Sequence, residues 1–333
     1  MSALPGYFMS YTLLRHLFFK LASSALAIVG AVAFMLLLPR LIPGDAATVI
    51  LGPRATPEAV AALRSRMGLD LSFPEQFLGF FARLFRGDFG VDAVNSRPIA
   101  QLIVAALPNT IILALSAMGL ALLFGVPLAL LSARRPGGWF DRVSAFASVG
   151  FVAAPSFVVS ILLLLFFAKR LGWFPVLGAG EPGNIPDQLH HLVLPAFALA
   201  VGWIGYIARL LRSSLLEVLG EAHIRTMQAY GVSEGRILLK YALKLAWIPT
   251  LAIVGMGIGE LLGGAVFAEV IFNRPGLGTL VVKAILERNY TIAQGGMFVI
   301  VALFVLATLI ADLLQSFSDP RERQRLIGQR ATA

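Results

Sequence analysis

The sequence contains no cysteine and few charged residues. None of its 333 residues is Cys, only 14% are Asp, Glu, Lys or Arg, and 58% are hydrophobic. The absence of cysteine excludes disulfide bonds and thiolate metal sites. A soluble domain usually carries about 25% charged residues. A chain with so little charge therefore does not have the composition of a soluble domain.

The motifs of common catalytic sites are also missing. The chain has no Gly-x-x-x-x-Gly-Lys-Ser/Thr phosphate loop, no His-Glu-x-x-His zinc motif and no Gly-x-Ser-x-Gly nucleophile motif. Its four histidines are scattered, apart from the neighbours His190 and His191, whose side chains diverge on a helix. We therefore expect no catalytic residue, no metal site, no cofactor and no ATP hydrolysis by this chain itself.

Long runs without charge dominate the sequence. About 20 helical residues are needed to span the hydrocarbon layer of a membrane. Six runs reach that length, the fifth of them interrupted only by Glu260: 21–39, 98–133, 143–168, 188–208, 245–268 and 289–311. The first run is longer than the apolar region of a signal peptide, so we interpret it as a retained span. The pattern predicts an all-α, polytopic membrane protein with six transmembrane helices.

The basic residues give the orientation of these helices. If the N-terminus is inside, the inner segments carry 15 Lys and Arg against 7 acids, and the outer segments carry 12 against 10. Lys and Arg accumulate on the inner side of membrane proteins. We therefore expect both termini inside. The net charge of +9 then reflects membrane orientation and not nucleic acid binding.

The outer segments are predicted to contain helices at 57–69, 74–86 and 279–287. Pro57 begins the first of them and Gly68 lies near its end. Two interpretations fit these segments. They cap the outer mouth of a pathway or dock a soluble protein, or they only pack on the outer surface.

Residues 209–249 form a charged, helix-forming segment between the fourth and fifth runs. Gly231 divides it into two short helices. Before the glycine, Ile224, Met227 and Tyr230 recur every three residues, and Glu221 precedes an arginine, Arg225, by four, which is a favourable helical pair.

After the glycine, Ser233 is placed to cap the second helix. This helix would carry a basic stripe of Arg236, Lys240 and Lys244 opposite an apolar face of Ile237, Leu238, Tyr241 and Leu245. A rigid helix–Gly–helix segment suits the docking of a soluble partner, and an amphipathic helix lying on lipid is the alternative.

Glu260 is the one acid deep within an apolar run. Such residues usually face the interior of a helix bundle or an aqueous cavity. It either lines a pathway or forms a hydrogen bond at a helix contact. Glu269 and Asp312 lie near the ends of their runs, where we expect them to be solvated. Five glycines of the fifth run should allow close packing of that helix: Gly255, Gly257, Gly259, Gly263 and Gly264.

A series of short motifs covers nearly the whole chain, in order. They are 41–45 (Leu-Ile-Pro-Gly-Asp), 68–70 (Gly-Leu-Asp), 86–90 (Arg-Gly-Asp-Phe-Gly), 107–110 (Leu-Pro-Asn-Thr), 154–157 (Ala-Pro-Ser-Phe), 191–195 (His-Leu-Val-Leu-Pro), 264–272 (Gly-Ala-Val-Phe-Ala-Glu-Val-Ile-Phe), 275–278 (Pro-Gly-Leu-Gly), 288–290 (Arg-Asn-Tyr), 294–295 (Gln-Gly) and Asp312 followed by 319–321 (Asp-Pro-Arg). In this order and spacing the chain resembles the inner-membrane permease subunit of bacterial ABC importers. The resemblance is to the dipeptide/oligopeptide/nickel group, and to its member with the long first periplasmic loop.

The resemblance implies a type I importer permease in the bacterial inner membrane, with cytoplasmic termini and surrounding lipid. Its partners would be a second permease subunit in a heterodimer, two ATP-binding subunits that hydrolyse ATP, and a periplasmic solute-binding protein. The chain would divide into the N-terminus and first span (1–43), a periplasmic helical loop (44–98), a five-helix core (99–320) and a cytoplasmic tail (321–333).

The resemblance also implies that 209–249 is the coupling segment, seated in a cleft of the ATPase subunit. The general family signature is Glu-Ala-Ala, three residues, Gly, nine residues and Ile-x-Leu-Pro. Anchored on Gly231, only Gly231 and Leu243 match it, and Glu221 remains an alternative for the charged contact. The candidate coupling residues are Glu221, Ala222, Arg225, Thr226, Met227, Ala229, Gly231 and Leu243.

Two other classes of function compete with the importer. An autonomous ion-coupled secondary transporter would need ionisable residues in several spans, where this chain has only Glu260 deep in a run. A membrane enzyme would need a nucleophile–base pattern, which is absent. The sequence leaves the solute open among peptides, nickel chelates, glutathione-like compounds and sugar-derived compounds.

Single cysteines introduced into this cysteine-free chain test the orientation directly. Cysteine at Ser72 or Asn184 should react with a membrane-impermeant thiol reagent added outside intact cells. Cysteine at Ser233 or Gln324 should react only after permeabilisation, because the positive-inside rule places these positions inside. Labelling of position 233 from outside would overturn the six-span topology.

Overall fold

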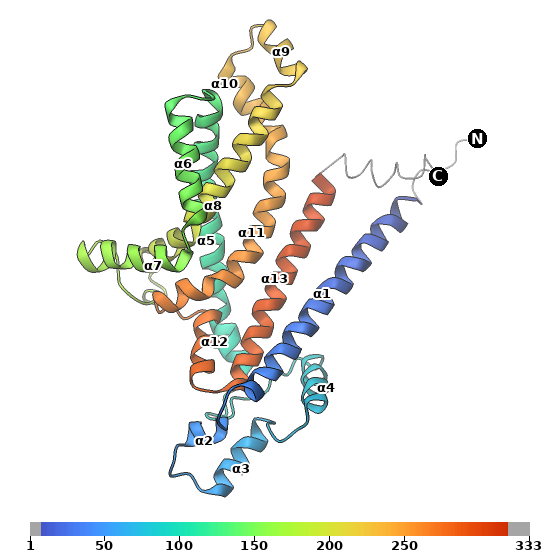
Figure 1. Ribbon diagram of the computed structural model, residues 1–333, viewed down its shortest axis with the longest axis vertical. Coiled ribbons are helices and arrows are strands. Elements are labelled where there is room, and N and C mark those ends of the chain that lie inside the picture. The colour runs from blue at the N-terminus through green and yellow to red at the C-terminus, as the bar shows by residue number, and fades with distance from the viewer. Residues whose placement is uncertain (1–7, 319–333) are drawn as a thin grey trace.

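The computed structural model describes residues 8–318, and this part of the chain consists of helices and connecting loops (Figure 1). Its only β-pairing is an isolated bridge between Val91 and Pro98. Five of its helices are long and apolar enough to cross a membrane: α1 Phe8–Leu41, α5 Ile99–Arg134, α8 Ile185–Leu219, α11 Leu243–Ile271 and α13 Tyr290–Ser318. The all-α, polytopic architecture is thus as predicted. The tail at 321–333, with Gln324, lies outside the described residues.

The predicted span at 143–168, the third in chain order, is a bent pair of helices. The first helix is α6 (Trp139–Ala153). The second is α7 (Ser156–Leu163), which continues as a π-helix over Leu164–Arg170, and it meets α6 at 99°. The break lies at Pro155, which has no backbone N–H to donate. Ala154 before it adopts the extended conformation that a following proline favours, with φ −78° and ψ 115°. Taken as one broken span, this pair gives the sixth crossing of the predicted topology.

The loop after α1 contains three short helices: α2 Ala46–Leu51, α3 Pro57–Arg66 and α4 Phe73–Leu84. The two helices predicted here are present, and each ends two or three residues early. The Glu75 carboxylate accepts hydrogen bonds from the backbone N–H (2.8 Å) and the hydroxyl (2.7 Å) of Ser72, which fixes the start of α4. Phe80 of α4 packs against Val32, Met35 and Leu36 of α1. The loop is therefore folded onto the first span. The third outer helix is α12, Leu277–Leu286.

α8 lies at the centre of the bundle. Two-thirds of its apolar 18-residue stretch is buried inside the protein, a larger share than in the other four spanning helices. Small residues let α5 approach it closely: a Cβ on Gly125 would lie 3.1 Å from the Ile204 carbonyl oxygen. On α11, a Cβ on Gly255 would overlap Ala311 of α13, so close packing at this glycine is confirmed. At Gly263 and Gly264, no atom lies within 4 Å of the position that a Cβ would occupy.

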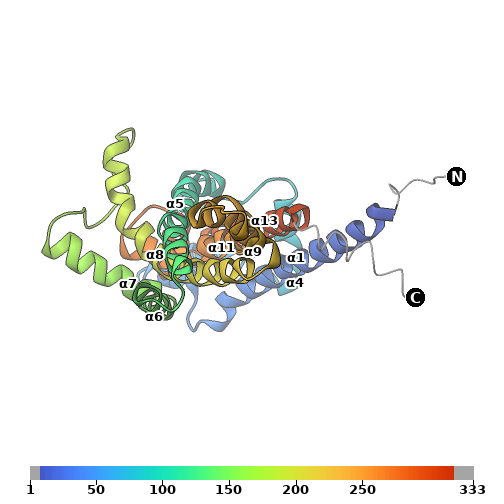
Figure 2. The ribbon, with the colours of Figure 1, turned by 90° about the horizontal axis from the view of Figure 1, so that it is seen from above.

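The inner and outer segments predicted from charge lie at opposite ends of the molecule. In Figure 1 the short helices α9 (Ala222–Ala229) and α10 (Glu234–Arg236) lie at one end of the long axis, and α2 and α3 lie at the other. From above, α9 overlies the core of α5, α8 and α11, while α7 and α1 extend to opposite sides (Figure 2). The fold thus separates the candidate coupling segment from the outer helices by the full length of the bundle.

Glu269 is buried in the structure, so the expectation that it is solvated was wrong. Its Oε1 accepts a hydrogen bond from the Thr110 hydroxyl (2.6 Å), and its Oε2 accepts one from the Thr279 backbone N–H (3.1 Å). The Thr110 Oγ1 in turn accepts a bond from the Leu277 N–H (2.8 Å). The carboxylate thereby ties α11 to α5 and α12. The side chain of Asp312 lies outside the described residues.

The turn before α12 is built around this carboxylate. A Cβ on Gly276 would overlap the Glu269 carboxylate, and one on Gly278 would lie 2.9 Å from Oε2. The glycines of the 275–278 motif therefore leave room for a charge that the loop covers. An apolar run that ends near Glu269 does not reveal that the following loop folds back over it.

Glu269→Ala should destabilise the chain by about 2–4 kcal/mol, because it leaves the Thr110 hydroxyl and the Thr279 N–H buried without an acceptor. We expect a lower apparent melting temperature in detergent. Glu269→Gln, which keeps one acceptor oxygen, should lose less. Glu287→Ala, an exposed acid at the end of α12, is the control and should leave melting unchanged. Equal melting of Glu269→Ala and the control would contradict this role.

Candidate functional site

The segment between α8 and α11 turns back on itself through α9. Gly220 ends α8, and Glu221 stands at the N-cap of α9. At the other end, Gly231 has a φ of +76°, its N–H donates to the Gln228 carbonyl (2.9 Å), and the Val232 N–H donates to the Met227 carbonyl (3.1 Å). This pair of bonds is a Schellman motif, which favours glycine at the left-handed position. The break predicted at Gly231 is confirmed, together with its positive φ.

One face of α9 is anchored to the bundle. Ile224 is fully buried and packs in a cluster with Leu211 and Leu215 of α8 and with Ile237 and Leu238 after the turn. Met227 is half-buried against the same cluster. Tyr230 was expected on this apolar stripe, but it is 85% exposed because the chain leaves the helix there. The anchor is therefore Ile224 with Met227.

The opposite face of α9 is open. Of the eight candidate coupling residues, six have exposed side chains or, for glycine, an exposed backbone on this short segment: Glu221, Ala222, Arg225, Thr226, Ala229 and Gly231. Met227 belongs to the anchor. Leu243 lies at the start of α11, half-buried in the inner cluster, and the structure does not bring it to the exposed surface. The spacing of the family signature relates Leu243 to Gly231 in the sequence, but the two residues do not lie on the same surface.

The predicted pair of Glu221 and Arg225 does not form. Glu221 Oε2 lies 3.0 Å from His223 Nδ1, and the Arg225 guanidinium donates to the Gly220 carbonyl (3.3 Å). Glu221 stands at the N-cap in extended conformation and not within the helix, so four residues of separation no longer place the two side chains on one face.

The second short helix is continuous with the spanning helix α11. The three residues of α10 continue through a π-helix over Ile237–Ala242 directly into α11. Ser233 occupies the N-cap position, but its side chain makes no capping bond. The basic stripe of Arg236, Lys240 and Lys244 is exposed as predicted. Leu245, predicted on the apolar face, is 44% exposed, because a π turn holds more residues than an α turn and shifts the following side chains around the axis.

An ion pair that the sequence did not reveal ties α6 to α8 at the end of the bundle where α9 lies. The Arg212 guanidinium donates to both oxygens of Asp141, through Nε to Oδ1 and through Nη2 to Oδ2 (2.6 Å). The Gly137 N–H also donates to Oδ2 (2.8 Å). In the sequence, the charges of Asp141 and Arg212 contributed only to the count that gave the membrane orientation. No spacing pattern links two positions that lie 71 residues apart.

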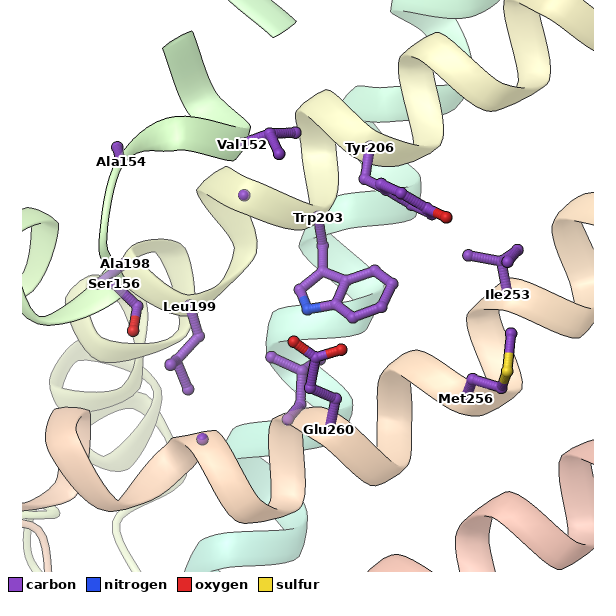
Figure 3. Close-up of a pocket in the computed structure, with 13 residues that line it drawn as sticks. Val152, Ala154, Ser156, Ala198, Leu199, Trp203, Tyr206, Ile253, Met256 and Glu260 are labelled. Carbon is purple, nitrogen blue, oxygen red and sulfur yellow. The ribbon is translucent and has the colours of Figure 1, made fainter. Parts of the chain in front are cut away.

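A cavity of about 490 Å³ lies between α6, α7, α8 and α11 (Figure 3). Its lining consists of Val152, Ala154, Ser156, Ala198, Leu199, Gly202, Trp203, Tyr206, Ile253, Met256, Glu260, Leu261 and Gly264. Glu260 is exposed to this space, and within 8–318 it has no hydrogen-bond or ion-pair partner. In the described part of the chain Glu260 therefore lines a cavity and makes no hydrogen bond at a helix contact.

Two aromatic rings form the wall beside Glu260. The Trp203 ring lies against Gly257, where a Cβ would come within 2.6 Å of the ring atoms. Trp203 and Tyr206 meet edge to face, with centroids 5.7 Å apart and planes at 70°. In Figure 3 the carboxylate end of Glu260 points toward the Trp203 ring. The sequence offered no signal for this wall, since aromatic residues at helical spacing usually belong to a core.

The adjacent histidines make ordinary local contacts. His190 Nε2 lies 2.8 Å from the Trp173 carbonyl oxygen, and His191 Nδ1 lies 2.9 Å from the Asp187 carbonyl oxygen. In the part of the chain that the structure describes, no three His, Asp or Glu residues are grouped so that they could hold a metal ion.

Family models match both halves of the chain. Residues 125–324 match the model described as "Binding-protein-dependent transport system inner membrane component", and residues 13–114 match the model of its N-terminal part. The chain is similar to "Probable peptide ABC transporter permease protein y4tP" of Sinorhizobium fredii, with 41% identity over 95% of this chain and 100% of the relative. It is also similar to the dipeptide transport system permease protein DppB of Alkalihalophilus pseudofirmus, with 38% identity over 84% and 91%.

The fold is similar to that of a chain in a crystal form of the MetNI methionine ABC transporter, described as inward facing. The TM-score is 0.54 at 20% sequence identity, and the match covers 66% of this chain and 97% of the other. At this identity the likeness concerns the fold alone.

Proposed function

The chain belongs to the family of binding-protein-dependent transport system inner membrane components, the permease subunits of ABC importers, and we propose that it carries peptides or similar small solutes. The cargo is inferred from relatives named for peptide and dipeptide transport. An ion-coupled secondary transporter finds no support, since these relatives are ABC permeases and Glu260 is the only carboxylate in the cavity lining.

The chain supplies one half of the translocation pathway, and a second permease subunit supplies the other half in a heterodimer. The supporting observation is the cavity of Glu260. An unpaired carboxylate in a transmembrane helix is costly against lipid and is normally found facing a protein interior or water. The side of the cavity that this chain leaves open would therefore face the partner permease, while the outer faces of the bundle contact lipid.

The exposed face of α9 docks one of the two ATP-binding subunits. Its anchored and open faces are the observation that carries this proposal, because a short helix held by Ile224 presents a rigid surface at the end of the bundle. The contacting residues would be Glu221, Ala222, Arg225, Thr226 and Ala229, with Gly231 shaping the turn and Met227 and Leu243 supporting it from the inner core. ATP would be hydrolysed on those subunits.

α9 is connected along the chain to two of the helices that line the cavity. α8 precedes it and carries Trp203 and Tyr206, and α11 follows it, after α10 and the π-helix, and carries Glu260. Closure of the ATP-binding subunits would push α9 and rock α8 and α11, which changes the side on which the pathway is open.

We place α9 and both termini in the cytoplasm and α2–α4 in the periplasm, with the chain in the bacterial inner membrane. The helices of 44–98 and α12 would then form the surface for the periplasmic solute-binding protein. The five-helix core at 99–320 would hold the pathway and the coupling segment at 209–249, and 321–333 would be a cytoplasmic tail.

Gly231→Val should break coupling without breaking assembly. No atom lies within 4 Å of the added Cβ, so the cost comes from the positive φ, about 1–3 kcal/mol. We expect the variant to pair with the second permease but to lose ATPase subunits on co-purification, or to lose the stimulation of ATP hydrolysis by loaded binding protein.

Gly235→Val is the matched control for this variant. It lies four residues on, is equally exposed and open, and has an ordinary φ, so its coupling should be nearly normal. If Gly231→Val transports as well as Gly235→Val, α9 is not the coupling element.

The purified chain alone should neither hydrolyse ATP nor accumulate solute in liposomes, because it lacks a phosphate loop and supplies only half of a pathway. Addition of the co-purifying subunits and ATP should produce uptake. Robust uptake driven by a proton gradient, with no other subunit present, would refute the importer and favour the secondary transporter.

A further inference from the structure

The cavity carries one fixed charge without a counter-ion. Among its thirteen lining residues, Glu260 is the only Asp or Glu, and no Lys, Arg or His accompanies it. A carboxylate in mostly apolar surroundings is unfavourable unless a cation or hydrogen-bond donors reach it. Within residues 8–318 no side chain donates a hydrogen bond to Glu260 and no cation pairs with it, so the carboxylate is free to bind a cation that enters the cavity.

The neighbouring rings select the kind of cation. Gly257, one helical turn before Glu260, leaves the space into which the Trp203 ring fits, so the ring is held beside the carboxylate. Tyr206 extends the same wall. The face of an aromatic ring attracts ammonium groups, and Trp does so most strongly. An organic cation can contact the carboxylate with its charge and the rings with its carbon atoms.

A metal ion fits this site less well. Ca²⁺ takes about six to eight oxygen ligands, and Mg²⁺ is usually bound through one or two carboxylates together with waters and phosphates. Glu260 is a single carboxylate beside apolar and aromatic side chains, and no second carboxylate lines the cavity.

We propose that Glu260, Trp203 and Tyr206 form a subsite for a primary ammonium group of the transported solute. The inference rests on the proposed function, because it takes this cavity as part of the pathway. Its volume of about 490 Å³ lies within the range of small-molecule sites, about 300–1,000 Å³. The permease itself then favours solutes with a free amine, in addition to any choice made by the binding protein.

The test uses the assembled importer in proteoliposomes, with saturating binding protein and ATP at the ATPase side. Uptake is measured for Ala-Ala, for N-acetyl-Ala-Ala, which has no ammonium group, and for N-acetyl-Ala-Lys, which has one only on its side chain. The variants are Glu260→Gln, Trp203→Leu and the control Glu181→Gln, which removes the same charge from an exposed loop residue outside the cavity.

Glu260→Gln should lower Ala-Ala uptake about five- to tenfold, a loss between that of an exposed and a buried charge pair. Trp203→Leu should lower it about two- to fivefold. N-acetyl-Ala-Ala uptake should change less than about twofold in either variant, as should all uptake by Glu181→Gln. Sensitivity of N-acetyl-Ala-Lys uptake to Glu260→Gln assigns the subsite to any primary ammonium, and insensitivity restricts it to the α-ammonium group.

The inference is wrong if the wild-type importer takes up Ala-Ala and Glu260→Gln behaves like Glu181→Gln. It is also wrong if the wild type takes up only N-acetyl-Ala-Ala, or if Glu260→Gln loses its partner permease, since Glu260 would then pair with a residue of that subunit. In these cases ATP-driven uptake or assembly of the wild type still supports the proposed function. Absence of ATP-driven uptake of all three probes by the wild type would refute both.

Discussion

Polar groups in an apolar medium must find their partners inside the protein, and this constraint shapes the whole chain. Helices satisfy their own backbone N–H and C=O groups through internal hydrogen bonds. Of the three buried carboxylates in the described residues, the two on helices are satisfied by neighbours, Glu269 by a hydroxyl and a backbone N–H group and Asp141 by Arg212. These two clusters join helices far apart in sequence, so the arrangement of the core depends on them. Glu260 is the exception among these acids, and that distinguishes the cavity from the packed interior.

The sequence predicted the features that follow from local chemistry. Uncharged runs located the spans, Gly231 marked the turn after α9, and Pro57 marked the start of an outer helix. What it did not predict depends on contacts across the fold. Glu269 lies near the end of an apolar run, and only the loop that folds over it removes it from water. Pro155 bends the third span by 99° although the run of apolar residues continues past it.

The candidate site divides in the same way. The position of α9 and the exposure of most of its candidate residues followed from pattern and resemblance. The partner of Glu221 did not, because the residue stands at the N-cap, and Leu243 lies in the inner core instead of beside Gly231. The wall of Trp203 and Tyr206 depends on the space at Gly257 of another helix. A single sequence does not show which residues of different helices lie in contact, so the packing of Trp203 against Gly257 could not be predicted from it.

The length of α8 after Pro195 has a mechanical consequence. Proline interrupts the hydrogen bonds of a helix, so the segment that acts as one rod is 196–219, about 36 Å long, which still exceeds the thickness of the hydrocarbon layer. A rod of this length tilted by about 10° around its midpoint moves each end by about 3 Å, in opposite directions. The Arg212 contact and the turn to α9 lie near one end of this rod, and the side chains of the cavity lie near its middle. Such a lever displaces its ends most and the cavity wall least, so a solute held at the fulcrum would stay in place while the entrances on either side exchange.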